Sequence, residues 1–240
     1  SEYVLSDSAG NEAGEIMKSF LDKGKTTGEA INDAIAAKGA NDGNNPPALF
    51  NLLGNRSLVM GGKNLQNLGF EDGLVGWQTE GDSRVINRLA SLAPPEGKKM
   101  AIISTGLGSV NNSNSAVIQD ICSQEGKLSI AFKYDFVSEE PLEYVGSRYD
   151  DNFRMMVTIN GTPTEVIQKT INNSSWIPIA GINFAGGDST TFHTGWQTVT
   201  QDLGVIKPAD VVKIEFRVSD KGDSIYDSAA LIDDIALAVN

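Results

Sequence analysis

The chain contains very little of the two residue types on which many enzymes and transition-metal sites depend, with one cysteine and one histidine among 240 residues. The single cysteine, Cys122, cannot form a disulfide within the chain, and the alternating apolar run around it predicts a buried thiol on a strand. A Ser-His-Asp or Cys-His site would have to use His193, and the sequence has no Gly-x-Ser-x-Gly motif. These absences favour a protein that is not an enzyme.

Basic residues are also scarce, since 19 Lys and Arg stand against 31 Asp and Glu, for a net charge of −12. We therefore expect no nucleic-acid partner, because phosphate binding needs clustered Lys and Arg. No apolar run approaches the roughly 18–20 residues that a membrane-spanning helix requires. Hydrophobic residues make up 40% of the chain, which is enough for a packed core. An acidic chain of this kind fits an exposed soluble protein that holds hard cations through carboxylates.

Helical patterning is confined to an N-terminal extension, residues 1–63. Apolar residues recur at helical spacing in two short stretches between residues 12 and 39, and a Gly/Asn/Pro-rich loop follows. The first six residues, Ser1–Ser6, are β-prone and have no hairpin partner nearby. They form either a frayed terminus or an edge strand, which pairs with the chain's own sandwich or with a neighbouring subunit.

The remaining residues, 64–240, show the alternation of β-strands separated by Gly, Asn and Ser turns. Many short strands without helices predict an all-β fold, an antiparallel jelly-roll β-sandwich. The predicted strands are Arg84–Asn87, Lys99–Ser104, Ala116–Cys122, Lys127–Ser138, Phe153–Asn160, Thr164–Ile171, Trp196–Leu203, Val211–Ser219 and Ala229–Val239.

Four segments of this region carry a resemblance to a known class of proteins: Asn67–Trp77, Thr194–Thr200, Asp220–Asp227 and Ser228–Ile235. Together they resemble the jelly-roll modules of bacterial exoproteins, which include carbohydrate-binding modules and the "choice-of-anchor" surface domains. The resemblance covers about residues 64–240. It implies a secreted protein of the cell surface or extracellular matrix, and it says more about the fold than about the ligand.

The resemblance also implies a calcium site. In many such carbohydrate-binding modules a glutamate of the first-strand motif and an aspartate of the last strand hold a structural Ca²⁺. Carried over to this chain, these are Glu71 and either Asp233 or Asp234. We therefore expect Asn67–Trp77 and Leu231–Ile235 to be the first and last strands, lying side by side. The alternative is that Glu71 faces solvent in a turn.

A second acidic group lies around a Phe-x-Ser-Glu-Glu … Asp-Asp-x-Phe arrangement, which resembles a strand–loop–strand of the surface domains. It offers Glu139, Glu140, Asp150 and Asp151 as ligands of another cation, although ordinary surface acidity also explains these residues. A further acidic turn around Asp227 lacks the spacing of an EF-hand loop.

Aromatic side chains are the usual means by which a β-sandwich holds a sugar, because a ring face packs on the C–H face of a pyranose. We expect Trp77 to be part of the core. Trp176, flanked by polar loop residues, is the best exposed candidate, and Tyr144 and Tyr149 extend the candidate ligand surface. Aromatics are only 7% of the chain, which is low for a sugar-binding protein.

The sequence therefore predicts a secreted, calcium-stabilised, non-enzymatic β-sandwich that acts in adhesion or surface assembly, with a glycan as the expected class of small ligand. The alternative is a structural subunit of an extracellular filament, which self-assembles by donating residues 1–10 to a neighbour. A glycan-cleaving enzyme, with Glu140 as the place to look for an acid, has no distinctive motif.

Overall fold

The computed structural model describes residues 67–107, 112–122, 125–185, 190–207, 210–222 and 225–239. The predicted N-terminal extension, including Ser1–Ser6, lies outside these residues. The chain divides into two units, Ser1–Gln66 and Asn67–Asn240, and all residues that the structure describes belong to the second. Within the described residues no helix is long and apolar enough to cross a membrane.

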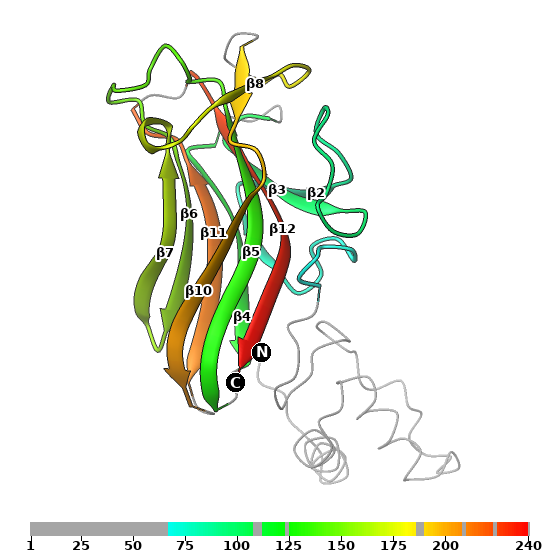
Figure 1. Cartoon of the computed structure of the whole chain (residues 1–240), viewed down its shortest axis with the longest axis vertical. Helices are drawn as coiled ribbons and strands as arrows, with labels where there is room; N and C mark the ends of the chain where they lie inside the picture. Colours follow the sequence, from blue (N-terminus) through cyan, green and yellow to red (C-terminus); the bar gives the residue numbers. More distant parts are fainter. Residues whose placement is uncertain are drawn as a thin grey trace, which may run out of the picture. The chain divides into compact units, whose positions relative to one another are not determined.

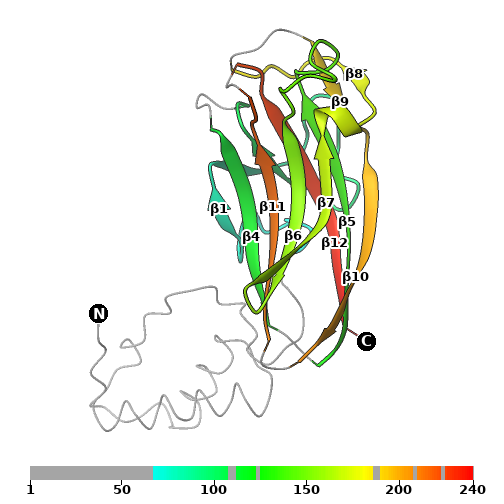
Figure 2. The same ribbon diagram turned by 90° about the vertical axis from the view of Figure 1, so that its left-hand side faces the viewer.

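The described unit is a sandwich of two antiparallel sheets, which Figures 1 and 2 show as two layers. The five-stranded sheet contains, in spatial order, β1 (Gln78–Glu80), β4 (Asn114–Cys122), β11 (Val211–Ser219), β6 (Asn152–Ile159) and β7 (Thr162–Thr170). The seven-stranded sheet contains β2 (Asp82–Ile86), β3 (Met100–Ser104), β12 (Ser228–Val239), β5 (Gly126–Ser138), β9 (Thr191–His193) and β8 (Ile177–Ile179), and β10 (Gln197–Ile206) also pairs with β5. A short 3-10 helix, η2, spans Ile171–Asn173.

The all-β sandwich confirms the predicted fold class, and each of the nine predicted strands corresponds to an observed strand. The turn at Asn160-Gly161 also forms as the sequence indicates. Both residues have positive φ, 51° and 80°, as the two-residue turn of a hairpin requires, and they join β6 to β7. The short strands β1, β8 and β9, of three residues each, are absent from the prediction because three residues are too few to show a period of two.

One prediction about the first strand is wrong. Asn67–Trp77 forms a series of turns, in which the amides of Phe70, Gly73 and Trp77 each donate to the carbonyl three residues before them. Phe70, Gly73 and Gly76 have positive φ, which an extended strand does not tolerate. The first strand, β1, starts only at Gln78.

The main core lies between the two sheets and is rich in aromatic rings. Phe132 packs edge-on against Phe216 at a centroid distance of 5.0 Å, and Trp77 packs against Phe70 at the same distance. Trp77 is buried in this core, as the sequence predicts. Such tilted and edge-to-face contacts add to the free energy gained from apolar burial.

A second apolar cluster covers the opposite, outer face of the seven-stranded sheet. Met100, Ile102 and Leu231 lie on this face, and Leu92 and Phe184 from the connecting segments pack over them. Strand β3 is therefore buried along its whole length, which agrees with its unbroken sequence Met-Ala-Ile-Ile-Ser. Acidic residues on the outer face of β5 and β12 are consequently buried as well.

Candidate functional site

Six carboxylates of the sandwich are each at most 2% exposed to solvent. They are Asp135, Glu139, Glu140, Asp151, Asp227 and Asp233. A carboxylate in an apolar interior is costly unless hydrogen-bond donors, a cation or a proton compensates its charge. What each of these groups contacts therefore indicates which of them act as structural acceptors and which fit a ligand.

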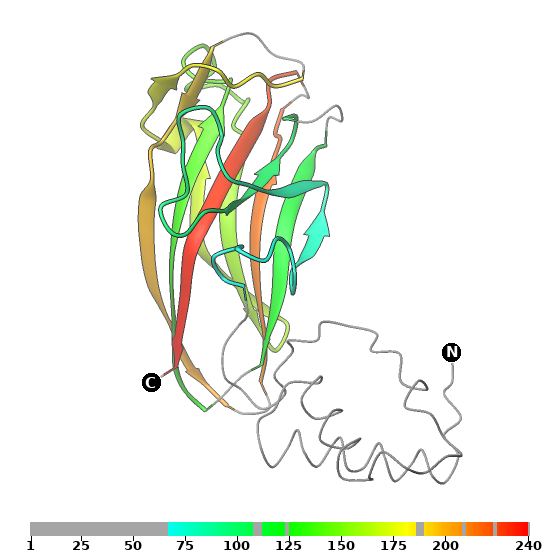
Figure 3. The same cartoon turned by 90° about the vertical axis from the view of Figure 1, so that its right-hand side faces the viewer.

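The first predicted cation site lies where the turn segment 67–77 passes β12. We call this place the seam and define it by Gly69, Glu71, residues 96–99 and Asp233. A Cβ atom added at Gly69 would be 4.0 Å from Oδ1 of Asp233, so the turn segment and the last strand are neighbours as expected, and Figure 3 shows them side by side. Asp233 Oδ2 accepts a hydrogen bond from the Glu96 amide at 3.2 Å; no donor lies in hydrogen-bonding geometry at its Oδ1, although the Asp234 amide is near enough to oppose the rise in the pKa of Asp233. Burial raises the pKa of Asp233 to about 6.

Glu71 belongs to the seam but its carboxylate contacts backbone rather than Asp233. Its Oε1 accepts hydrogen bonds from the amides of Lys98 and Lys99 at 2.7 and 2.8 Å, and these bonds lower the pKa of Glu71. Asp234 lies outside the seam, because a bulge in β12 turns it to the Lys133 ammonium at 2.9 Å. Of the three predicted ligands, Asp233 keeps a carboxylate oxygen that accepts no hydrogen bond and could bind a cation. Glu96, which the sequence prediction missed, lies beside that oxygen and is a further candidate ligand.

The second predicted group is divided between the two faces of the seven-stranded sheet. Glu140 and Asp151 lie together, because the Asp151 amide donates to Glu140 Oε2 at 3.3 Å. Asp151 also accepts from the Lys221 amide at 2.7 Å and from the Ser228 hydroxyl at 2.7 Å. Burial, and then the nearby charge of Glu140, hold the pKa of Asp151 well above its usual range.

Glu139 does not join this pair. It follows β5 with its side chain on the outer face and lies opposite Asp227, a residue that the sequence prediction did not select as a ligand. Asp150 is half-buried and accepts a hydrogen bond from the Asn172 amide at 2.9 Å. Among the described residues no three Asp, Glu, His or Cys side chains surround a common metal position. A cation here would therefore need hydroxyl, carbonyl or water oxygens in addition to carboxylates.

The single histidine pairs with a buried acid. His193 Nδ1 lies 2.8 Å from Asp135 Oδ2, and the Thr194 hydroxyl donates to the other Asp135 oxygen at 3.2 Å. Burial raises the pKa of Asp135, and the His193 and Thr194 contacts oppose that rise. In the described part of the chain no hydroxyl or thiol hydrogen-bonds to the imidazole, so the pair lacks the nucleophile of a catalytic triad.

Tyrosines gather at the end of the sandwich formed by residues 104–107, 139–151, 220–222 and 225–227, which we call the loop end; Figure 1 shows it beside β8. Tyr144 packs against Tyr149 at 5.2 Å and against Tyr226 at 5.1 Å. The Arg148 guanidinium lies 5.0 Å from the centroid of the Tyr149 ring. Tyr149 also lies directly over Gly222, where any Cβ atom would overlap its ring.

Trp176, in contrast, is not the exposed platform that its polar neighbours suggest. Its indole N–H donates to the Ile171 carbonyl at 3.1 Å, and its ring packs against Phe136 at 5.4 Å. The ring is half-buried at the margin of the main core. The capping box of η2 between Thr170 and Asn173 fixes the turn that brings Trp176 there.

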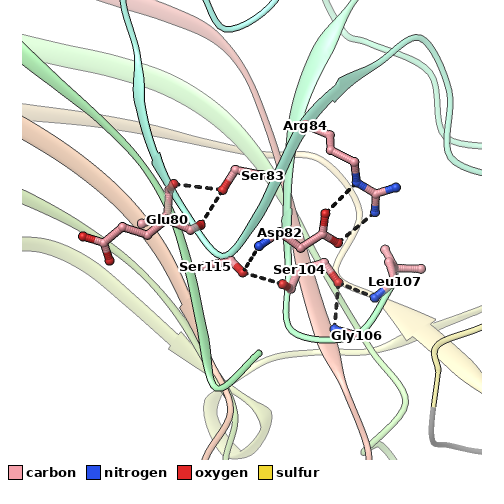
Figure 4. Close-up of polar contacts among 9 residues, drawn as sticks. Glu80, Asp82, Ser83, Arg84, Ser104, Gly106, Leu107 and Ser115 are labelled. Carbon is pink, nitrogen blue, oxygen red and sulfur yellow. Dashed lines mark hydrogen bonds and ion pairs between the residues drawn. The ribbon is translucent and has the colours of Figure 1, made fainter. Parts of the chain in front are cut away.

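A serine network fixes the loop end from the side of β3. Ser104 Oγ accepts from the amides of Gly106 and Leu107 at 3.0 and 2.7 Å. The Ser115 hydroxyl donates to the Ser104 carbonyl at 2.6 Å and accepts from the Asp82 amide at 2.8 Å. Figure 4 shows how these contacts join β2, β3 and β4 and hold the turn at Gly106.

A separate cavity of about 160 Å³ lies between β6, β7 and β10, and none of the residues that line it belongs to the loop end. Val157, Ile159 and Leu203 provide its apolar lining, and Thr164, Glu165 and Gln201 its polar lining. In the described part of the chain no strand pairs with the outer edge of β7 or of β10. This side of the sandwich therefore presents two open edges.

No protein-family model matches the chain, and no curated protein matches it. Similar solved structures include TmCBM61 in complex with β-1,4-galactotriose, at 17% identity and a TM-score of 0.43, over 73% of this chain and 97% of that one. The K3 cleaved adhesin domain of Lys-gingipain from Porphyromonas gingivalis matches at 11% identity and a TM-score of 0.39, over 68% and 95% of the two chains. The enzymatically active domain of bacteriophage CBA120 tailspike protein 4 matches at 11% identity and a TM-score of 0.40, over 73% and 21%. At these TM-scores the similarities carry no argument about ligand or activity.

Proposed function

We propose that this chain is an extracellular, non-enzymatic binding module whose ligand is a glycan and whose ligand surface is the tyrosine cluster of the loop end. The observation that carries the proposal is the packing of Tyr144, Tyr149 and Tyr226 at centroid distances of 5.1–5.2 Å on two neighbouring loops. Tyrosine offers a pyranose both an apolar face and a hydroxyl, and it loses little side-chain entropy on binding.

The surroundings of the tyrosines favour a binding surface over a core. Leu142 is 67% exposed, Ile225 54% and Val145 48%, so an apolar rim accompanies the three rings. Soluble proteins seldom expose several large apolar side chains together without a binding role. The Arg148 side chain donates to the Tyr149 hydroxyl at 3.0 Å and supplies a polar group at the margin of this surface.

The loops are preorganised, which lowers the cost of binding. The Tyr144 amide donates to the Glu140 carbonyl at 3.1 Å, and the Asp150 amide donates to the Lys221 carbonyl at 3.3 Å. The second bond ties the loop that carries Tyr144 and Tyr149 to the loop that carries Tyr226. A surface held in this way spends less ordering entropy when it takes a ligand.

The function is tested by glycan-array binding of the whole chain and of Tyr149→Ala. The wild-type chain is expected to bind at least one class of glycan, and Tyr149→Ala to bind it at least about tenfold more weakly, because one stacking contact is lost. Val205→Ala, which truncates a 75% exposed side chain on β10, is the matched control and should bind normally. Silence of the wild-type chain across the array would contradict the proposal.

Calcium is part of the proposal as a structural ion at the seam. Asp233 Oδ1, buried and without a donor, is the oxygen that motivates it, and Glu96 lies beside it. In this account Ca²⁺ joins the turn segment 67–77 to β12 and stabilises the fold. If the chain has the same unfolding temperature in Ca²⁺ and in a chelator, the proposal of a structural Ca²⁺ at the seam is wrong.

The second candidate function is a filament subunit, and the open edges of β7 and β10 favour it. A strand from another copy can pair with such an edge and place apolar side chains in the cavity beside Leu203. The expected donor is Ser1–Ser6. Deleting residues 1–10 should then reduce filaments to single particles in electron micrographs, while a variant with these ten residues in scrambled order serves as the control. A deletion variant that assembles as the full chain does would exclude this function.

A further inference from the structure

Asp227 and Glu139 form a cross-strand pair at the loop end. The register pairs Ser228 of β12 with Ser138 of β5, and the Glu139 amide donates to the Asp227 carbonyl at 3.2 Å. Asp227 and Glu139 are therefore directly opposite each other, with Cβ atoms about 5 Å apart. Both follow the alternation of the outer face, on which Ala229 and Val137 belong to the second apolar cluster.

Both carboxylates are completely buried. Neither oxygen of Asp227 has a donor in hydrogen-bonding geometry, although the Thr105 hydroxyl is near enough to oppose the rise in the pKa of Asp227 that burial causes. In the described part of the chain no Lys, Arg or His side chain forms an ion pair with Asp227. The described residues therefore provide no counter-charge for the Asp227 carboxylate.

The space for the Asp227 carboxylate is provided by a glycine. Asp227 lies over Gly106, and a Cβ atom at that position would overlap the carboxylate. The Ser104 hydroxyl holds the Gly106 amide (Figure 4), and the Gly106 carbonyl accepts from the Ala185 amide at 2.8 Å. The turn at Gly106 therefore lies directly against the Asp227 carboxylate, and Ala185 in turn hydrogen-bonds to that turn.

Two like charges directly opposite each other on a sheet destabilise it, and more so in a dry interior than in water. Two arrangements remove the repulsion: a bound cation, or one proton shared by the two carboxylates. A divalent ion neutralises both charges and takes the lone pairs that Asp227 offers to no donor. Carboxylates in an irregular, enclosed site are the ligands that Ca²⁺ prefers.

We propose that Asp227 and Glu139 hold a Ca²⁺ ion at the loop end, a second ion separate from the seam. Carbonyl, hydroxyl and water oxygens complete its coordination, since two carboxylates supply only part of the six to eight oxygens that Ca²⁺ takes. The ion fastens the ends of β5 and β12 to the turn at Gly106 and so stiffens the base of the loop that carries Tyr226. The site itself does not depend on glycan binding.

The test is the number of Ca²⁺ ions that the full chain binds, measured by calorimetric titration with CaCl₂ after removal of metal. Asp227→Asn should bind one ion fewer than the wild-type chain, whether or not the seam also binds. Glu139→Gln should do the same. Asp233→Asn is the reference for the seam, and Glu143→Gln, an exposed residue of the same loop, is the matched control.

At a Ca²⁺ concentration 100 times Kd, the ion should raise the unfolding temperature of the wild-type chain by about 5–10 °C relative to Asp227→Asn.

If a single variant folds poorly, the double variant Glu139→Gln/Asp227→Asn replaces it in the test. This variant removes both negative charges, and its amide side chains have nearly the same size as the carboxylates that they replace. It is expected to fold without Ca²⁺ and to bind one ion fewer than wild type. An unchanged number of ions in Asp227→Asn overturns the proposal. So does a metal-free wild-type chain that gains stability only on acidification and gains none from Ca²⁺, which is the behaviour of a shared proton. Loss of glycan binding in Tyr149→Ala has no bearing on either result.

Discussion

The seam and the loop end both contain carboxylates at the margin of the seven-stranded sheet, but the surroundings of these carboxylates differ. At the seam, the exposed Glu71 takes two backbone amides, and its pKa falls. At the loop end, Asp151 and Asp227 are fully buried, and burial raises the pKa of each. Backbone donors thus stabilise the ionised carboxylate of Glu71, whereas the buried Asp151 and Asp227, like the buried Asp233 of the seam, favour a proton or a cation.

This difference separates a structural acceptor from a candidate ligand. Glu71 matches the resemblance to carbohydrate-binding modules, yet its Oε1 is already used by the segment 97–99. Asp227 is not among the ligands that the resemblance implies, yet neither of its oxygens has a donor in hydrogen-bonding geometry. A carboxylate is therefore better judged as a ligand by the donors around it than by its place in a motif.

The largest expected effect is that of Asp151→Ala at the loop end. It removes the acceptor of the Lys221 amide and of the Ser228 hydroxyl, and Ser228 is completely buried. We expect a loss of about 2–4 kcal/mol in the free energy of unfolding, because the Lys221 amide loses its acceptor and a cavity replaces the buried carboxylate, while the Ser228 hydroxyl keeps Ser138 as its partner. Urea denaturation measures this loss.

Glu71→Ala is the comparison at the seam. It should change the midpoint of urea denaturation far less, because water can reach the amides of Lys98 and Lys99. Equal losses in the two variants would contradict the difference between buried and exposed carboxylates.

A smaller effect is expected from Gly106→Ala, which places a Cβ atom where the Asp227 carboxylate lies. The expected loss is about 1–3 kcal/mol, in the range of other overpacking substitutions. Gly73→Ala is the matched substitution near the seam, where a Cβ atom meets nothing within 4 Å and only the positive φ of 71° opposes it. The change at Gly106 should also weaken Ca²⁺ binding, whereas the change at Gly73 should not. Thermal unfolding and CaCl₂ titration of both variants make the comparison.

The smallest effect per step is the dependence of stability on pH in metal-free protein, at most about 1.4 kcal/mol per pH unit for one group. Because the pKa of Asp151 is raised on folding, the native state binds more protons than the unfolded state above the ordinary value of 3.8. Its contribution to stability is therefore complete below about pH 4 and is lost as the pH rises through the raised pKa. Glu71 acts in the opposite sense and loses its contribution below its ordinary value of 4.5. Urea denaturation between pH 4 and 9 should show stability falling with pH, and Asp151→Asn should flatten the slope. A wild-type slope of the opposite sign would contradict this assignment.

Local patterns predicted those parts of the fold that depend on neighbouring residues. Alternation located the long strands, and Asn160-Gly161 located the β6–β7 hairpin. The turns of Asn67–Trp77 were misread, although Gly73 and Gly76 are the residues that a turn with positive φ requires. The unbroken apolar run of β3 was the available sign that the outer face is covered.

The candidate site was harder to predict because it depends on cross-strand pairing. Glu139 and Glu140 are adjacent in sequence, but a period of two sends them to opposite faces, where Glu139 meets Asp227 and Glu140 meets Asp151. The register between β5 and β12, about 90 residues apart in sequence, decides these partners. The burial of Trp176 likewise follows from a tertiary contact, with Phe136, that its polar sequence neighbours do not reveal.

The central claim, that the loop end is the ligand surface, is tested most directly by NMR with labelled tyrosines. The ring signals of Tyr134, Tyr144, Tyr149 and Tyr226 are followed while the glycan that binds best on the array is added. We predict that the signals of Tyr144, Tyr149 and Tyr226 shift in a saturable way, whereas that of Tyr134, which is buried in the main core, stays in place. Saturable binding that leaves the three loop-end tyrosines unchanged would contradict the account.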